Sequence, residues 1–138
     1  MKLSTLKSPI ESMEQKALVK WLNLHPLLKN YFCKNDNEGP RKTIVRDDKV
    51  VPVGLYNAIG MGLRPGVSDI FIYWPTKTYH GLWLEVKRKK KYSPSEMNTD
   101  TWKAQEVFQM HVKSVGYMAE FCFGWEDGKR IIENYLLS

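Results

Sequence analysis

The sequence has few cysteines and no long apolar run. Its two cysteines, Cys33 and Cys122, are too few for a disulfide framework or a four-thiolate zinc site, and we expect both to be small buried groups. No segment approaches the about 20 apolar residues of a membrane span. Residues 1–10 also lack the apolar core of a signal peptide. These absences predict a protein of the reducing cytoplasm with no membrane partner.

Motifs of several enzyme classes are missing as well. The chain has no His-Glu-x-x-His pair, no phosphate-binding glycine loop and no zinc-type spacing of Cys and His. Its three histidines fall on different predicted elements, which argues against a catalytic dyad or a histidine metal site. The sequence therefore gives no support to zinc-protease or P-loop chemistry.

What the chain does contain is typical of one basic globular domain. Its 138 residues predict a single domain, and 43% hydrophobic with 12% aromatic residues exclude general disorder. The 21 Lys and Arg residues against 15 Asp and Glu give a net charge of +6 and a pI near 9.3. This charge favours nucleic acid over a membrane surface as a partner, although many small basic proteins bind neither.

The spacing of apolar residues predicts a mixed α/β domain with helices packed on a central sheet. Residues 53–61 fit either a short helix or an irregular apolar segment, and residues 89–100 predict an exposed loop. The first helix is expected to be capped by Ser8. Helices are expected over residues 9–25, 99–115 and 125–137, and strands over residues 31–35, 68–74, 81–87 and 117–123.

Alternation along the strand at residues 81–87 places charged and aromatic side chains on one face. Trp83, Glu85 and Lys87 share that face, whereas the leucines and the valine between them share the other. Asp69 opens the preceding strand, at a separation that fits two neighbouring strands joined by a turn. Asp69 is therefore expected directly opposite Glu85 or diagonal to it.

Two carboxylates this close repel each other unless a cation neutralises them. Mg²⁺ binds one or two carboxylates together with waters and substrate phosphate oxygens. Lys87, two residues from Glu85, can orient or deprotonate an attacking water or stabilise charge on phosphorus. The pattern predicts hydrolysis of a phosphodiester. The alternative is a surface ion pair between Glu85 and Lys87, with Asp69 as an ordinary turn residue.

Polar residues on the apolar stripes of two helices add to this prediction. Glu11 lies on the stripe of the first helix and Glu14 at its edge, where a buried carboxylate is costly unless it is paired or binds a metal. Gln105 lies among apolar residues of the helix at 99–115, where it can hydrogen-bond a ligand water or a phosphate. The alternatives are a frayed first turn for Glu11 and a helix-edge position for Gln105.

Four short segments occur in an order typical of a known family. They are Asn37-Glu38-Gly39-x-Arg41, Gly62-x-x-Pro65-Gly66-Val67-Ser68-Asp69, Gly81-Leu82-Trp83-Leu84-Glu85-Val86-Lys87, and Gln105 followed by Gly116-Tyr117. With these segments, residues 11–136 resemble the VRR-NUC domain of the PD-(D/E)XK nuclease superfamily, in its stand-alone form typical of phage-encoded proteins. Ser68 stands where a proline is common, and Pro40 lies inside the first segment, but neither departure removes a ligand.

The resemblance implies a restriction-endonuclease-like fold and DNA cleavage that depends on Mg²⁺ or Mn²⁺. It assigns Asp69 and Glu85 as metal ligands, Lys87 as the catalytic lysine and Gln105 as the family's glutamine. It matches Glu11, with Glu14 as the rival, to the acidic residue of the first helix. Stand-alone nucleases of this kind are similar to Holliday junction resolvases, which implies a homodimer that acts on branched DNA in the host cytoplasm.

A run of five cations begins at the proposed catalytic lysine. We expect its last four members to bind DNA phosphates, and the alternative is a solvated loop. Those four residues are Arg88, Lys89, Lys90 and Lys91. A second, weaker basic candidate consists of Arg41, Lys42 and Arg46. Two rival functions stay open: a nickase or flap endonuclease of the same fold, and a non-catalytic basic DNA-binding protein.

Overall fold

The computed structural model describes residues 10–35, 44–51 and 53–138. Its main sheet has four strands in the order β1-β4-β5-β6, with β4 antiparallel to both β1 and β5, and β5 parallel to β6. The strands are β1 (Phe32–Lys34), β4 (Ile70–Ile72), β5 (Leu82–Lys87) and β6 (Met118–Phe123). This mixed sheet and its flanking helices confirm the predicted fold class.

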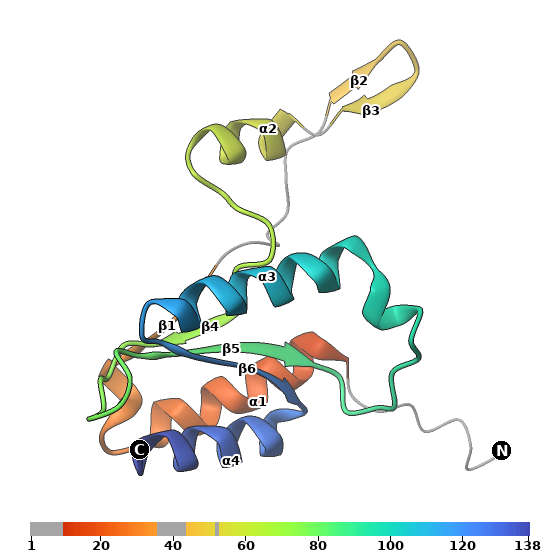
Figure 1. Ribbon diagram of the computed structural model, residues 1–138. Helices are drawn as coiled ribbons and strands as arrows, with labels where there is room; N and C mark the ends of the chain where they lie inside the picture. Colours follow the sequence, from red (N-terminus) through yellow and green to blue (C-terminus); the bar gives the residue numbers. More distant parts are fainter. Residues whose placement is uncertain (1–9, 36–43, 52) are drawn as a thin grey trace, which may run out of the picture.

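Helices cover both faces of the main sheet (Figure 1). One face is covered by α1 (Glu11–Leu24) and α4 (Trp125–Leu136), and the other by α3 (Asp100–Ser114). Leu82, Leu84 and Val86 point toward α1 and α4 and belong to the buried core. The intervening side chains of β5 consequently face α3, as the predicted alternation requires.

Local contacts set where the helices begin. Ile10 occupies the N-cap position of α1 without a side-chain hydrogen bond, whereas Ser8, the predicted cap, lies outside the described residues. The Thr99 side chain accepts a hydrogen bond from the Trp102 amide and caps α3. Of these two N-cap residues, only Thr99 therefore stabilises the start of its helix through its side chain.

A second region projects away from the main sheet on the side of α3 (Figure 1). It contains a hairpin of β2 (Ile44–Arg46) and β3 (Lys49–Val51), followed by α2 (Val53–Gly60). The hairpin was missed in the sequence, while α2 settles residues 53–60 as a helix. Asp47 and Asp48 both have positive φ, the backbone that a two-residue hairpin turn requires.

Two remaining expectations concern cysteines and membranes. Cys122 is buried as expected, but the prediction for Cys33 was wrong because this residue lies exposed on the edge strand β1. Within the described parts of the chain, no helix has both the length and the apolar character needed to cross a membrane. Two short 3₁₀ helices, η2 (Leu28–Asn30) and η3 (Glu96–Asn98), complete the described elements.

Candidate active site

The antiparallel pairing of β4 and β5 brings the two predicted carboxylates together. Ile70 pairs with Leu84, so one further step along the register places Asp69 directly opposite Glu85. Oδ2 of Asp69 accepts a hydrogen bond of 2.8 Å from the Val86 amide, which holds its carboxylate against the end of β5. The sequence left open whether Asp69 lies directly opposite Glu85 or diagonal to it, and the register places it directly opposite.

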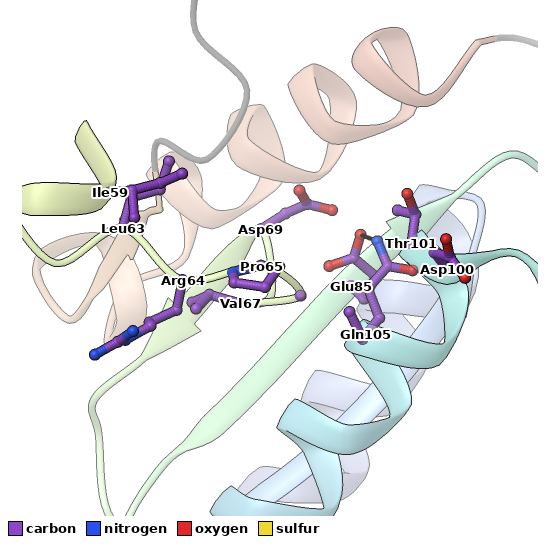
Figure 2. Close-up of a pocket in the computed structure, with 12 residues that line it drawn as sticks. Ile59, Leu63, Arg64, Pro65, Val67, Asp69, Glu85, Asp100, Thr101 and Gln105 are labelled. Atoms are coloured by element: carbon purple, nitrogen blue, oxygen red, sulfur yellow. Dashed lines mark hydrogen bonds between the residues drawn. The ribbon is translucent and has the colours of Figure 1, made fainter. Parts of the chain in front are cut away.

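Gln105 links Glu85 to Lys87 in a buried chain of hydrogen bonds. Its Nε2 donates to Oε1 of Glu85 at 2.7 Å, and its Oε1 accepts from Nζ of Lys87 at 2.7 Å. The residue exposures are 4% for Glu85, 6% for Lys87 and 5% for Gln105. The amide therefore bridges the buried side chains of Glu85 and Lys87, and Figure 2 shows Asp69 on the side of Glu85 and Gln105. This geometry contradicts the surface ion pair considered as the alternative.

The site disfavours a charged Glu85 when no cation is bound. Burial, and then the negative charge of Asp69, raise the pKa of Glu85 to about 9, although the Lys87 charge opposes this shift. Oε2 of Glu85 is buried, and no donor among the described residues hydrogen-bonds to it. A cation between Glu85 and Asp69 would neutralise both groups and satisfy this oxygen.

The donor set fits Mg²⁺ or Mn²⁺. No cluster of three His, Cys, Asp or Glu side chains surrounds a metal position among the described residues. Mg²⁺ nevertheless needs only one or two protein carboxylates, with waters and phosphate oxygens completing its coordination. Asp69 and Glu85 are the residues that would hold the ion.

The two glutamates of α1 have different surroundings. Oε2 of Glu14 accepts a hydrogen bond of 2.6 Å from the Trp125 amide, so this buried carboxylate caps the N-terminus of α4. Glu11 is exposed, and its negative charge contributes to the raised pKa of Glu85. Glu11 therefore stays the predicted acidic residue of the first helix, whereas Glu14 contacts the start of α4.

An aromatic contact to Lys87 was not predicted. Nζ of Lys87 lies 4.7 Å from the ring centroid of Trp102 and 5.7 Å from that of Phe121, and the two rings stack on each other. A desolvated cation over an indole is stabilised by about 2 kcal/mol. The available signal was the position of Trp102, one helical turn before Gln105 on the same stripe of α3.

A cavity of about 420 Å³ opens beside the carboxylates (Figure 2). Asp69, Glu85 and Gln105 line one part of it, and Asp100 and Thr101 at the start of α3 lie close by. The sequence did not single out Asp100 or Thr101, because neither stands in a motif. The cavity gives the acidic pair access to a ligand.

The predicted DNA-binding cations divide into engaged and exposed side chains. Arg88 is half-buried, Lys89 and Lys91 are exposed, and Lys90 forms an ion pair with Glu96. Arg41 lies outside the described residues. These four residues come directly after Lys87 in the chain and are less buried than it is. Their binding to DNA stays a prediction.

The architecture and the arrangement of these side chains define a restriction-endonuclease-like α/β domain. A solved structure named VRR_NUC domain protein matches it with a TM-score of 0.72 and 20% identity, covering 96% of this chain and 92% of that chain. The chain therefore has the fold of a VRR-NUC domain, and the resemblance seen in the sequence is confirmed for the fold. No protein-family model matches the sequence, and no curated protein is significantly similar to it.

Proposed function

We propose that this protein is a metal-dependent DNA endonuclease that hydrolyses phosphodiester bonds. The observation that carries the proposal is the buried chain of Glu85, Gln105 and Lys87 beside Asp69. Removing an ion from water costs several kcal/mol, so a glutamate and a lysine at these positions are poor choices for stability alone. The nuclease name of the matching structure supports the same class of activity.

Each side chain has a distinct part in the proposed reaction. A bound Mg²⁺ or Mn²⁺ supplies positive charge to the scissile phosphate and lowers the pKa of a water. Asp69 and Glu85 hold that ion, and Gln105 fixes the positions of Glu85 and Lys87. Lys87 orients the attacking water or stabilises the negative charge that builds on the phosphate.

We further propose that the substrate is branched DNA and that two copies act together. Paired cuts in a four-way junction need two sites related by a twofold axis. Tyr56 on α2 and Met61 just after it are 65% and 82% exposed, and exposed apolar side chains of this size are typical of interaction surfaces. Light scattering without DNA should give about twice the monomer mass. A chain that stays monomeric alone and on a junction contradicts paired incision.

The activity is tested by single substitutions that remove a charge and preserve shape. Asp69→Asn and Glu85→Gln should each lower cleavage of a four-way junction in Mg²⁺ by about 10²-fold or more. DNA binding should persist, because less negative charge then faces the phosphates. Glu96→Gln is the matched control, since it makes the same change at an exposed glutamate, and it should cleave at the wild-type rate.

The same assay separates the rival functions. Labelled duplex, nicked duplex, flap and four-way junction DNA are incubated with Mg²⁺, with Mn²⁺ and with EDTA. Binding without cleavage under every condition would favour a non-catalytic DNA-binding protein. Cleavage of flaps alone, or of one strand only, would favour a flap nuclease or nickase. Full cleavage by Glu85→Gln, in a preparation free of contaminating nuclease, would overturn the proposed site.

A further inference from the structure

The cavity beside Glu85 extends well beyond the acidic pair. Ile59 of α2, Leu63, Pro65 and Val67 of the loop before β4, and Ala104 of α3 make up its apolar wall. Gly66 lets that loop touch α3, because a Cβ there would lie 2.3 Å from the Ala104 carbonyl oxygen, and its φ is +82°. The wall is therefore built by the close approach of the loop to α3.

The apolar part of this wall suits a nucleobase better than the sugar-phosphate backbone. Asp69 and Asp100 line the cavity and repel phosphate wherever no cation intervenes. The apolar part of the wall offers a phosphate no hydrogen-bond donor. Arg64 also lines the cavity, but Figure 2 shows its guanidinium directed away from the carboxylates. A nucleobase has flat apolar faces that pack on such side chains, and it carries no charge.

We propose that the cavity binds one unstacked nucleobase, from the nucleotide next to the phosphate held at Asp69 and Glu85. This inference rests on the proposed function, because it takes that phosphate as the point of attachment. The cavity volume, about 420 Å³, lies within the range of about 300–1,000 Å³ typical of small-ligand pockets. Thr101 and Asp100 add a hydroxyl and a carboxylate close to the acidic pair, where they can meet the polar edge of a base.

The pocket implies a preference for one class of DNA. A base inside a duplex must leave its stack and its partner to enter, which costs a few kcal/mol. An unpaired base at a branch point, gap or flap avoids most of that cost. The pocket therefore selects DNA with an unpaired nucleotide beside the cut.

Filling the cavity tests the proposal directly. Ala104→Leu keeps a good helix former on α3 and projects a larger side chain into the pocket. Ala58→Leu is the matched control, because Ala58 lies on α2 beside Ile59 but does not line the cavity. The probe is 2-aminopurine, placed at successive positions around the branch point of a junction. Its fluorescence rises on unstacking and is read in Mg²⁺ during the first moments after mixing, before cleavage proceeds.

We expect one position to brighten with the wild type and with Ala58→Leu, and to stay dim with Ala104→Leu at saturating protein. An abasic nucleotide at that position should weaken wild-type binding about tenfold and leave Ala104→Leu unchanged, since stacking of a base is worth about 1–3 kcal/mol. No brightening at any position, or equal brightening with Ala104→Leu, would overturn the pocket. Glu85→Gln should keep the fluorescence signal and lose cleavage, so failure of the nuclease proposal is recognised separately.

Discussion

Two glutamate–lysine pairs, only a few residues apart in the chain, are treated in opposite ways by the fold. Glu85 and Lys87 at the end of β5 are buried and joined through Gln105, and the pKa of Glu85 is raised to about 9 by burial and by Asp69. Lys90, in the loop that follows, and Glu96, at the start of η3, form a direct ion pair at the surface, and that hydrogen bond lowers the pKa of Glu96 to about 2. The pKa values of the two glutamates therefore shift in opposite directions, because one is buried beside a second carboxylate and the other is paired at the surface.

This difference in burial indicates which of the two pairs is expected to bind a ligand. The exposed pair already satisfies both of its charges, so it requires no further ligand. The buried site combines Glu85 with a second carboxylate and leaves Oε2 of Glu85 without a donor among the described residues. A buried glutamate beside a second, half-buried carboxylate is stabilised by a proton or a cation, and this requirement marks the end of β5 as the reactive region.

The pH dependence of stability should separate the two regions most strongly. A carboxyl whose pKa rises from 4.5 to about 9 on folding binds more protons in the folded state, so stability falls as pH increases through that interval. In EDTA, the wild type should lose stability relative to Glu85→Gln from about pH 5 to 9, by up to about 1.4 kcal/mol per pH unit. Urea unfolding across this pH range measures the difference.

Glu96→Gln provides the matched control for that measurement. The lowered pKa of Glu96 places its titration below about pH 5, so its curve should run parallel to the wild type at higher pH. Adding Mg²⁺ at pH 8 should raise the melting temperature of the wild type but not of Glu85→Gln. Parallel curves for wild type and Glu85→Gln would show that Glu85 titrates as an ordinary exposed carboxyl.

The aromatic contact of Lys87 gives a smaller expected effect on cleavage. Trp102→Leu removes the ring beneath the ammonium, and a loss of about 1–2 kcal/mol corresponds to a five- to thirtyfold fall in kcat. KM should stay nearly constant, because Lys87 is proposed to act on the reacting phosphate. Trp102→Phe keeps a ring and should restore most of the rate.

The control for Trp102 is another aromatic residue of α3. Phe108 packs edge-on against Trp83 rather than against Lys87, so Phe108→Leu should leave kcat close to wild type. Equal losses in Phe108→Leu and Trp102→Leu would assign both rings to packing alone. A Trp102→Phe variant as slow as Trp102→Leu would point to the same conclusion.

The sequence predicted the features that depend on local periodicity. Alternation in β5 identified Glu85 and Lys87 on one face, and the pairing of neighbouring strands brought Asp69 to them. Glu11 and Glu14 could not be separated, since they lie one turn apart on α1. Their difference depends on the start of α4, more than 100 residues later in the chain.

Three other features could not be predicted from the sequence, either because their sequence signal is weak or because they depend on contacts between distant segments. The β2–β3 hairpin is short, and its Asp47-Asp48 turn was the available cue, since aspartate tolerates positive φ better than most residues. The contact between Trp102 and Lys87 depends on how α3 crosses β5, which periodicity does not specify. The apolar wall beside the carboxylates likewise requires the loop before β4 to meet α3.

The smallest expected effect concerns the exposed cations after β5. Lys91 is exposed, whereas Lys90 is engaged with Glu96, so Lys91 is the better candidate to bind a DNA phosphate. Lys91→Ala should lower the slope of log affinity against log salt by about one, without changing the preference among DNA structures. Lys20→Ala on the outer side of α1 is the matched control and should leave the slope unchanged. An unchanged slope for Lys91→Ala would show that this side chain is solvated and does not contact a phosphate. Of the two regions compared, only the buried site would then be expected to bind DNA.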